Sequence, residues 1–232
     1  MKKLVSVLLF TFAVIIAVSC TSNEKRAEKL IKDYMFKNLH DYSSYEPVET
    51  KVDTAYNDLL YIDSAVIRVA LFMDAEEMQR ESMKDVDDAL DNLSLWSSPY
   101  MTSYGRSKYK EAKSKLIESL NNAAEAAQTA YKIASEVNEI SKNVDYDEMY
   151  GWKVSHKFRC NNRGGNKMLG QYVFIIDKNF KRILNEYDIE DESMKEGIDA
   201  INTLKKDETV TSLKSQAEKL RSMAEDAAKK FK

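Results

Sequence analysis

His156 and Cys160 are the two residues whose side chains come closest to a catalytic pair. A thiol beside an imidazole can act as a nucleophile activated by a general base. The residues are four positions apart in a segment of strict alternation, which places them on one strand face with backbones about 13 Å apart. A nucleophile and its base need about 3 Å between heavy atoms. We therefore interpret His156 as a core histidine with satisfied nitrogens and Cys160 as a buried thiol, and we predict no catalytic residue.

The sequence offers little for metal binding. His40 and His156 are the only histidines, which are too few for a zinc site of three histidines. Acidic residues gather at 145–148, but a calcium loop needs oxygen ligands at defined offsets and a glycine for its sharp turn. Gly151 is the only glycine nearby and its offset is wrong. We expect a solvated connector at 145–148, no metal and no cofactor.

Two groups of side chains are candidates for a binding patch. One is a basic row on the outer face of a strand, suited to an anionic glycan or lipid headgroup: Lys153, Lys157 and Arg159. The other gathers aromatic side chains in a loop, where they suit contacts with a glycan or a protein: Trp96, Tyr100, Met101 and Tyr104. Each group has a plainer explanation. The row can be a solvated sheet face with neighbouring acids, and the cluster can plug the end of a helical bundle.

The N-terminus has the pattern of a secretory signal. Lys2 and Lys3 are followed by an apolar stretch, Leu4–Val18, that closes on small residues before Cys20. A helix of that length measures about 22 Å, which is short for a bilayer core of about 30 Å. The segment resembles bacterial lipoprotein signals, which end in an aliphatic residue, two small residues and cysteine, although it has Ala17 where leucine is commoner.

This resemblance implies that residues 1–19 are removed and that Cys20 carries the lipid. Several acyl chains hold a protein stably at a membrane without a spanning helix, and residues 21–26 would form a short polar tether. We expect an outer-membrane protein of the cell envelope, on either the periplasmic face or the cell surface. An ordinary secretory signal with an incidental cysteine and an uncleaved anchor are the alternatives.

Composition favours a helical domain that does not bind nucleic acid. Removal of residues 1–19 leaves 213 residues, enough for a sizeable core. The signal contains two of the 35 basic residues, so 33 basic and 38 acidic residues remain and the net charge is −5. Nucleic-acid binders usually carry a basic excess. Two prolines and six glycines in 232 residues are typical of long helices with few loops.

Apolar periodicity predicts several helices. The first covers residues 23–40, and the second covers 57–96 with a break or bend at 74–79, where the apolar stripe becomes polar. The clearest helix, 106–144, has an apolar arc wide enough to pack on two sides, and 57–96 is its natural antiparallel partner. Stripes over 194–204 and 210–231 predict two C-terminal helices.

Between the helices the period changes from 3.6 to 2. Strict alternation over 152–160 predicts a half-buried strand, and strands at 168–176 and 182–189 follow after short turns. Residues 45–52 are predicted to form a further short strand, which Pro47 would restrict to a sheet edge. The predicted class is α+β, mostly α, with long antiparallel helices, a three-stranded antiparallel meander and two C-terminal helices. We treat residues 20–232 as a single domain with a helical part (20–145), the meander (146–190) and the C-terminal helices (191–232).

Two segments, together with the Cys20 signal, resemble uncharacterised lipoproteins of the Bacteroides type. One is SYEPVETKVD at 44–53, and the other is GWKVSHKFR at 151–159, followed by a glycine turn and FIID at 174–177. The resemblance extends over most of the chain. It implies an envelope location and no chemistry, since the family has no assigned activity.

These observations favour a non-enzymatic envelope lipoprotein that binds a protein, a glycan or another envelope component. The alternative is a hydrolase whose carboxylates are brought together only by the fold, and two acids facing one cleft would support it. A third hypothesis is a structural role, in which the long helices act as a spacer or as an oligomer seam.

Overall fold

The computed structural model describes residues 23–98 and 102–231. The predicted signal at 1–19, the predicted lipidation site Cys20, and Tyr100 and Met101 of the predicted aromatic loop lie outside these residues. Contacts divide the chain into two compact units, Met1–Asp58 with Asp145–Lys195 and Leu59–Val144 with Glu196–Lys232. Treatment of 20–232 as one domain stays a prediction. Within the described ranges, no helix is both long and apolar enough to cross a membrane.

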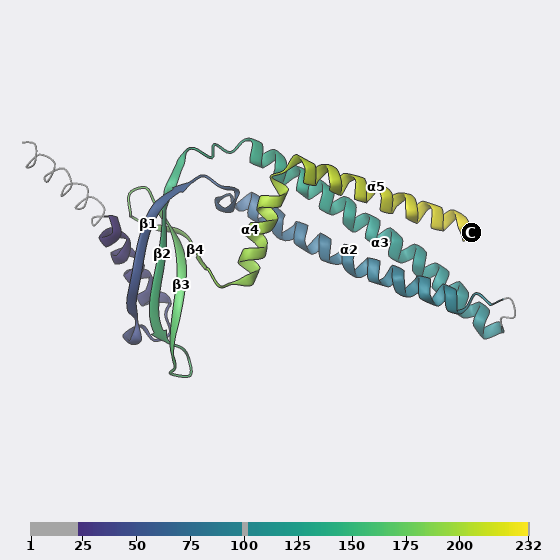
Figure 1. Ribbon diagram of the computed structural model, residues 1–232, viewed down its shortest axis with the longest axis horizontal. Helices are drawn as coiled ribbons and strands as arrows, with labels where there is room; N and C mark the ends of the chain where they lie inside the picture. The colour runs from purple at the N-terminus through teal and green to yellow at the C-terminus, as the bar shows by residue number, and fades with distance from the viewer. Residues whose placement is uncertain (1–22, 99–101, 232) are drawn as a thin grey trace, which may run out of the picture. The chain divides into compact units, whose positions relative to one another are not determined.

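The first unit is a helix packed on an antiparallel sheet. The helix covers residues 23–38, and the sheet has the order β1-β2-β3-β4, with β1 (Glu46–Tyr56), β2 (Met149–Asn161), β3 (Lys167–Asp177) and β4 (Ile183–Asp188). The alternation predicted for β2 is confirmed. One face of the sheet and one side of the helix form a common core (Figure 1), whose buried members are Ala27, Ile31, Met35, Val154, Phe158, Phe174 and Ile176.

The sheet has four strands and not the predicted three, because β1 pairs with β2 at the edge of the meander β2-β3-β4. The segment 45–52 was expected to be a short separate strand; instead β1 runs to Tyr56 and pairs with β2 as far as Met149. Pro47 lies in an edge strand, as predicted, because β2 is the only strand that pairs with β1 in the described part of the chain. Since Ala55 is the one buried residue of β1, its sequence lacks the apolar alternation that reveals a strand.

The second unit is built on two long antiparallel helices, α2 (Asp63–Leu95) and α3 (Ser103–Lys142), with α5 (Asp207–Lys230) along α3 (Figure 1). α3 packs on α2 and on α5, which confirms the two-sided packing inferred from its wide arc. Of the break or bend predicted at 74–79, the break is wrong, because α2 is continuous there. Ala75 belongs to the same buried cluster as the alanines Ala130 and Ala134 of α3, so a small side chain is enough for α2 to pack on α3 within this polar stretch.

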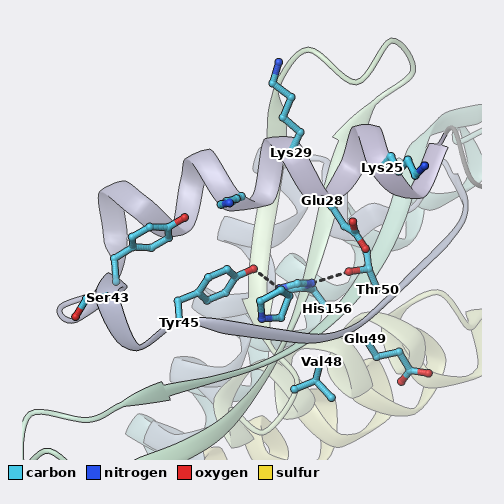
Figure 2. Close-up of a pocket in the computed structure, with 12 residues that line it drawn as sticks. Lys25, Glu28, Lys29, Ser43, Tyr45, Val48, Glu49, Thr50 and His156 are labelled. Carbon is cyan, nitrogen blue, oxygen red and sulfur yellow. Dashed lines mark hydrogen bonds between the residues drawn. The ribbon is translucent and has the colours of Figure 1, made fainter.

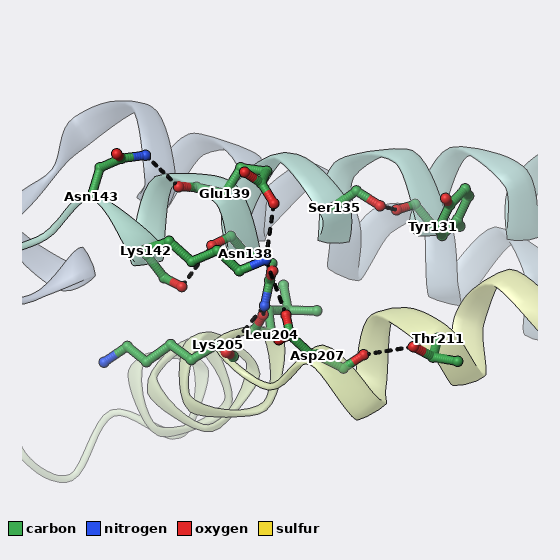
Figure 3. Close-up of polar contacts among 11 residues, drawn as sticks. Tyr131, Ser135, Asn138, Glu139, Lys142, Asn143, Leu204, Lys205, Asp207 and Thr211 are labelled. Atoms are coloured by element: carbon green, nitrogen blue, oxygen red, sulfur yellow. Dashed lines mark hydrogen bonds and ion pairs between the residues drawn. The ribbon is translucent and has the colours of Figure 1, made fainter.

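A buried amide joins α3 to the turn between α4 (Glu192–Leu204) and α5. Asn138 is 3% exposed, and its Nδ2 donates to the carbonyl oxygens of Leu204 at 3.3 Å and Lys205 at 3.1 Å (Figure 3). These carbonyls stand at the C-terminal end of α4, where backbone acceptors lie beyond the regular hydrogen bonds of the helix. On the surface nearby, Lys142 lies 3.2 Å from Asp207. Asn138 thus holds the turn between the two C-terminal helices against α3.

Candidate functional site

A groove of about 760 Å³ lies in the first unit between the N-terminal helix, residues 23–38, and strand β1 (Figure 2). Its volume lies within the range of small-molecule sites, roughly 300–1,000 Å³. Charged side chains line the helix side: Lys25, Glu28, Lys29 and Lys32. The connection and the strand contribute Tyr42, Ser43, Tyr45, Pro47, Val48, Glu49 and Thr50, and His156 lies beneath.

His156 forms the floor of the groove and is 1% exposed. The Tyr45 hydroxyl lies 2.7 Å from Nε2, and Thr50 Oγ1 lies 3.0 Å from Nδ1 (Figure 2). Burial lowers the pKa of His156 to about 4, so the ring is neutral at pH 7, with one donor and one acceptor nitrogen. Both nitrogens are therefore occupied, as predicted for a core histidine, and neither is left to activate the Cys160 thiol.

Aromatic rings form the wall of the groove beside His156. Tyr42 stacks on Tyr45 with ring centroids 5.5 Å apart, and Tyr45 in turn contacts Phe158 at 5.7 Å. Burial raises the pKa of Tyr45 to about 12, which keeps its hydroxyl protonated and able to hold His156. Both tyrosines are only half-buried, so part of this aromatic wall faces the groove.

A network around Asp41 sets the position of that wall. The Asp41 carboxylate accepts hydrogen bonds from Ser43 Oγ at 2.5 Å and from Asn161 Nδ2 at 3.1 Å, and these bonds lower its pKa. The hydroxyl of Ser44 also accepts from the backbone N–H of Asn161 at 2.7 Å. The connection that carries Tyr42 is therefore tied to the end of β2.

The rim of the groove on the helix side is cationic. Lys25, Lys29 and Lys32 occupy positions i, i+4 and i+7, which lie on one side of a helix at steps of about 6 and 4.5 Å. None of the three forms an ion pair with any described residue. On the strand side, Glu49 is already engaged by Lys51 at 2.9 Å and by Lys157 at 3.7 Å. Glu28 is thus the one carboxylate of the groove not held in a described ion pair.

The predicted basic row lies on the outer sheet face, where each cation is opposite an acid of β1. The register pairs Lys153 with Asp53, Lys157 with Glu49 and Arg159 with Glu46. Lysine and arginine charges are offset by such cross-strand neighbours. The geometry therefore favours the plainer explanation of the row, a solvated face with neighbouring acids.

Of the predicted aromatic loop, the structure describes Trp96, at the end of α2, and Tyr104, which lies in the first turn of α3 and not in a loop. Their rings meet edge to face with centroids 5.7 Å apart, and Tyr104 is 62% exposed. This pair belongs to the second unit, whereas the basic row belongs to the first. A binding role for the loop stays a prediction.

Other residues singled out in the sequence have local structural partners. The acidic connector at 145–148 is held by Asn57 Nδ2, which donates to the Asp145 carbonyl at 3.2 Å and to Glu148 Oε2 at 3.3 Å. Cys160 is a half-buried free thiol whose pKa is raised by burial and by the charge of Asp41. Among residues 23–98 and 102–231, no group of three or more histidine, cysteine or acidic side chains could hold a metal ion.

A second hollow of about 580 Å³ lies at the β4 edge of the same unit. Three carboxylates line it: Glu186, Asp188 and Asp191. The Tyr34 hydroxyl donates to Glu186 Oε1 at 2.6 Å, and burial is the first cause that raises the Tyr34 pKa to about 12. Two or more acids therefore face one hollow, which is the arrangement the hydrolase alternative requires.

Sequence reasoning missed the cationic groove. The spacing of Lys25, Lys29 and Lys32 was visible, but three lysines at helical intervals also describe an ordinary solvated face. Their significance depends on β1 lying alongside, and the sequence did not reveal the pairing of β1 with β2. Nothing in the sequence around Thr50 and Tyr45 indicated that their hydroxyl groups contact His156.

Comparison of the chain with protein-family models, with curated proteins and with solved structures finds no match.

Proposed function

We propose that the protein is a lipid-anchored lipoprotein of the bacterial cell envelope, held in the outer membrane through Cys20, that binds a ligand without catalysing a reaction. The single observation that carries the binding role is the groove between residues 23–38 and β1. It combines an aromatic wall, hydroxyl groups and lysines that form no ion pair with the residues that the structure describes, in a volume of about 760 Å³. Such convergence of polar groups on an apolar wall is typical of ligand sites.

Two features support the proposed arrangement. The cationic rim begins at Lys25, five residues after Cys20. The helix begins at Asn23, so a few residues at most separate Cys20 from it, and an acylated Cys20 would keep the groove close to the membrane surface. His156, the side chain under the groove most suited to acid–base work, is committed to Tyr45 and Thr50, which favours binding over catalysis.

Cell fractionation with protease shaving of intact cells tests the location. We expect the wild-type protein in the outer-membrane fraction and a Cys20→Ala variant outside it. Loss of the protein on shaving would place it on the cell surface, and protection would place it on the periplasmic face. Recovery of the wild-type protein in the soluble fraction, with the same distribution as Cys20→Ala, would overturn the proposal.

The second candidate function is a carboxylate-based hydrolase at the β4 hollow, favoured by the common lining of Glu186 and Asp188. These residues are two apart in β4, so their side chains lie on the same face. If this candidate is right, Glu186→Gln and Asp188→Asn will each abolish a hydrolytic activity of the purified protein. An activity that both variants retain would exclude it.

A further inference from the structure

We infer that the groove between the N-terminal helix and β1 binds an acidic oligosaccharide, with its anionic groups at the lysine rim and its hydroxyls toward Glu28 and Thr50. This inference rests on the proposed binding function and names its ligand class. The groove contains both halves of the required chemistry, charge at the rim and hydroxyl recognition within (Figure 2).

The three lysines of the rim favour a ligand with anionic groups. Lys25, Lys29 and Lys32 are exposed and have no ion-pair partner among the described residues, so a ligand would not have to displace a carboxylate to reach them. Their helical steps of about 6 and 4.5 Å are comparable with the length of a sugar unit. A chain with acidic groups on successive units can therefore meet more than one ammonium group.

Below the lysine rim, the Glu28 carboxylate favours ligand hydroxyl groups, which can donate hydrogen bonds to it, over further anionic groups. Glu28 lies on the helix side, and Figure 2 shows its carboxylate directed toward Thr50. A carboxylate accepts hydrogen bonds from hydroxyl groups but repels a phosphate or a second carboxylate. A ligand that is anionic throughout fits the rim and not the interior, whereas an acidic sugar presents hydroxyls beside each charge.

The wall suits a sugar ring. Tyr42 and Tyr45 are stacked and half-buried, and tyrosine combines a flat apolar face with a hydroxyl. The apolar face of a pyranose packs on such a ring while its hydroxyls remain free for polar partners. Pro47 and Val48 extend the apolar surface along β1.

The strand side disfavours an acidic peptide. A peptide that enters a groove beside an edge strand normally adds to the sheet through backbone hydrogen bonds. Pro47 has no N–H to donate, and the register of β1 shifts between Pro47 and Glu49. The groove-lining part of β1 therefore offers an irregular backbone edge, and recognition must come from side chains.

Calorimetric titration of the full protein, purified in a non-ionic detergent, tests the inference. The probes are tetragalacturonate, neutral maltotetraose, tetra-aspartate and inorganic phosphate. We expect tetragalacturonate to bind at least about tenfold more tightly than the other three, a difference of about 1.4 kcal/mol. We also expect its affinity to fall as salt is raised, because exposed charges are screened.

Charge-matched variants locate the site. The triple substitution Lys25→Gln, Lys29→Gln and Lys32→Gln should weaken tetragalacturonate binding at least about tenfold. Its control, Lys110→Gln, Lys132→Gln and Lys219→Gln, removes the same charge from exposed lysines of α3 and α5 and should bind as the wild type does. Glu28→Gln should weaken tetragalacturonate binding without weakening phosphate binding, and unchanged melting temperatures would show that the variants are folded.

Several outcomes would overturn the inference. They are equal binding of maltotetraose, tighter binding of tetra-aspartate or phosphate, no binding of tetragalacturonate, and equal losses in the groove and control triples. None of them affects the proposed location, which depends on Cys20. A protein that is acylated at Cys20 but does not bind tetragalacturonate would keep its envelope role and lose this ligand class.

Discussion

The hydroxyl of Tyr45 lies 2.7 Å from Nε2 of His156, a contact between residues 111 positions apart in the chain. It joins the connection after the N-terminal helix to the middle of β2. Because His156 is 1% exposed, this nitrogen has no access to water as a substitute partner. The contact therefore holds the groove wall and the sheet core together.

The substitution Tyr45→Phe tests the stability that this hydroxyl contributes. It leaves a buried ring nitrogen without a partner while keeping the stacked ring, and such a loss costs about 1–3 kcal/mol. We expect urea unfolding to show a decrease of that size in the free energy of unfolding. Tyr104→Phe, at a position 62% exposed, is the control and should change it by less than about 0.5 kcal/mol. Equal effects of the two substitutions would contradict the account.

The burial of His156 predicts a dependence of stability on pH. Its pKa is lowered from 6.5 to about 4 by burial, so between these values the unfolded chain binds a proton that the folded protein excludes. The contribution is fully present above pH 6.5 and is lost as the pH falls toward 4. The slope reaches at most about 1.4 kcal/mol per pH unit.

Urea unfolding of the wild type and of His156→Gln between pH 4 and pH 8 measures this slope. The variant removes the titrating group, so its curve should be flatter than that of the wild type over the same window. Parallel curves for the two proteins would show that His156 does not titrate as described.

Asn138 provides a test within the second unit. Asn138→Ala leaves the carbonyls of Leu204 and Lys205 without their buried donor and should lower the free energy of unfolding by about 1–3 kcal/mol. The control is Asn121→Ala, at an exposed position of the same helix, for which less than about 0.5 kcal/mol is expected. Thermal unfolding would contradict this role if both variants melted at the same temperature.

Substitution of two glycines by alanine should change the free energy of unfolding in opposite directions. A Cβ at Gly151 would lie 2.2 Å from the carbonyl oxygen of Ile176, whereas a Cβ at Gly197 has no neighbour within 4 Å. Gly151→Ala should therefore destabilise the protein by about 2 kcal/mol or more, because the backbone of β3 must move. Gly197→Ala, in α4, should stabilise it by about 0.5–1 kcal/mol. Denaturant titration of both variants measures the difference, and a stable Gly151→Ala protein would contradict the close approach of β2 and β3.

Most of the fold was predictable from periodicity, because the period follows from which side of each element is buried. Alternation around Val154 and Phe158 identified β2, and the wide arc of α3 anticipated its contacts with α2 and α5. The length of β1 and the continuity of α2 were not predicted, and the reasons differ. β1 is an edge strand with polar residues on both faces, and α2 needs only Ala75 where it meets the alanines of α3.

The candidate site was less predictable than the fold. That both ring nitrogens of His156 form hydrogen bonds could be inferred, because a buried imidazole needs partners. Which residues provide these partners could not be inferred. Thr50 and Tyr45 reach it through the pairing of β1 with β2 and through the turn held by Asp41, and both depend on contacts between segments far apart in the chain. The same is true of the acids at the β4 hollow.

Mass spectrometry of the N-terminal peptide, taken from the protein isolated from its native membrane, tests the central proposal most directly. A lipid-anchored lipoprotein should yield a mature peptide that begins at Cys20 and carries the added mass of its acyl chains, and Cys20→Ala should yield no such peptide. A peptide that begins at Met1, or one that begins near residue 20 with an unmodified cysteine, would contradict the proposal.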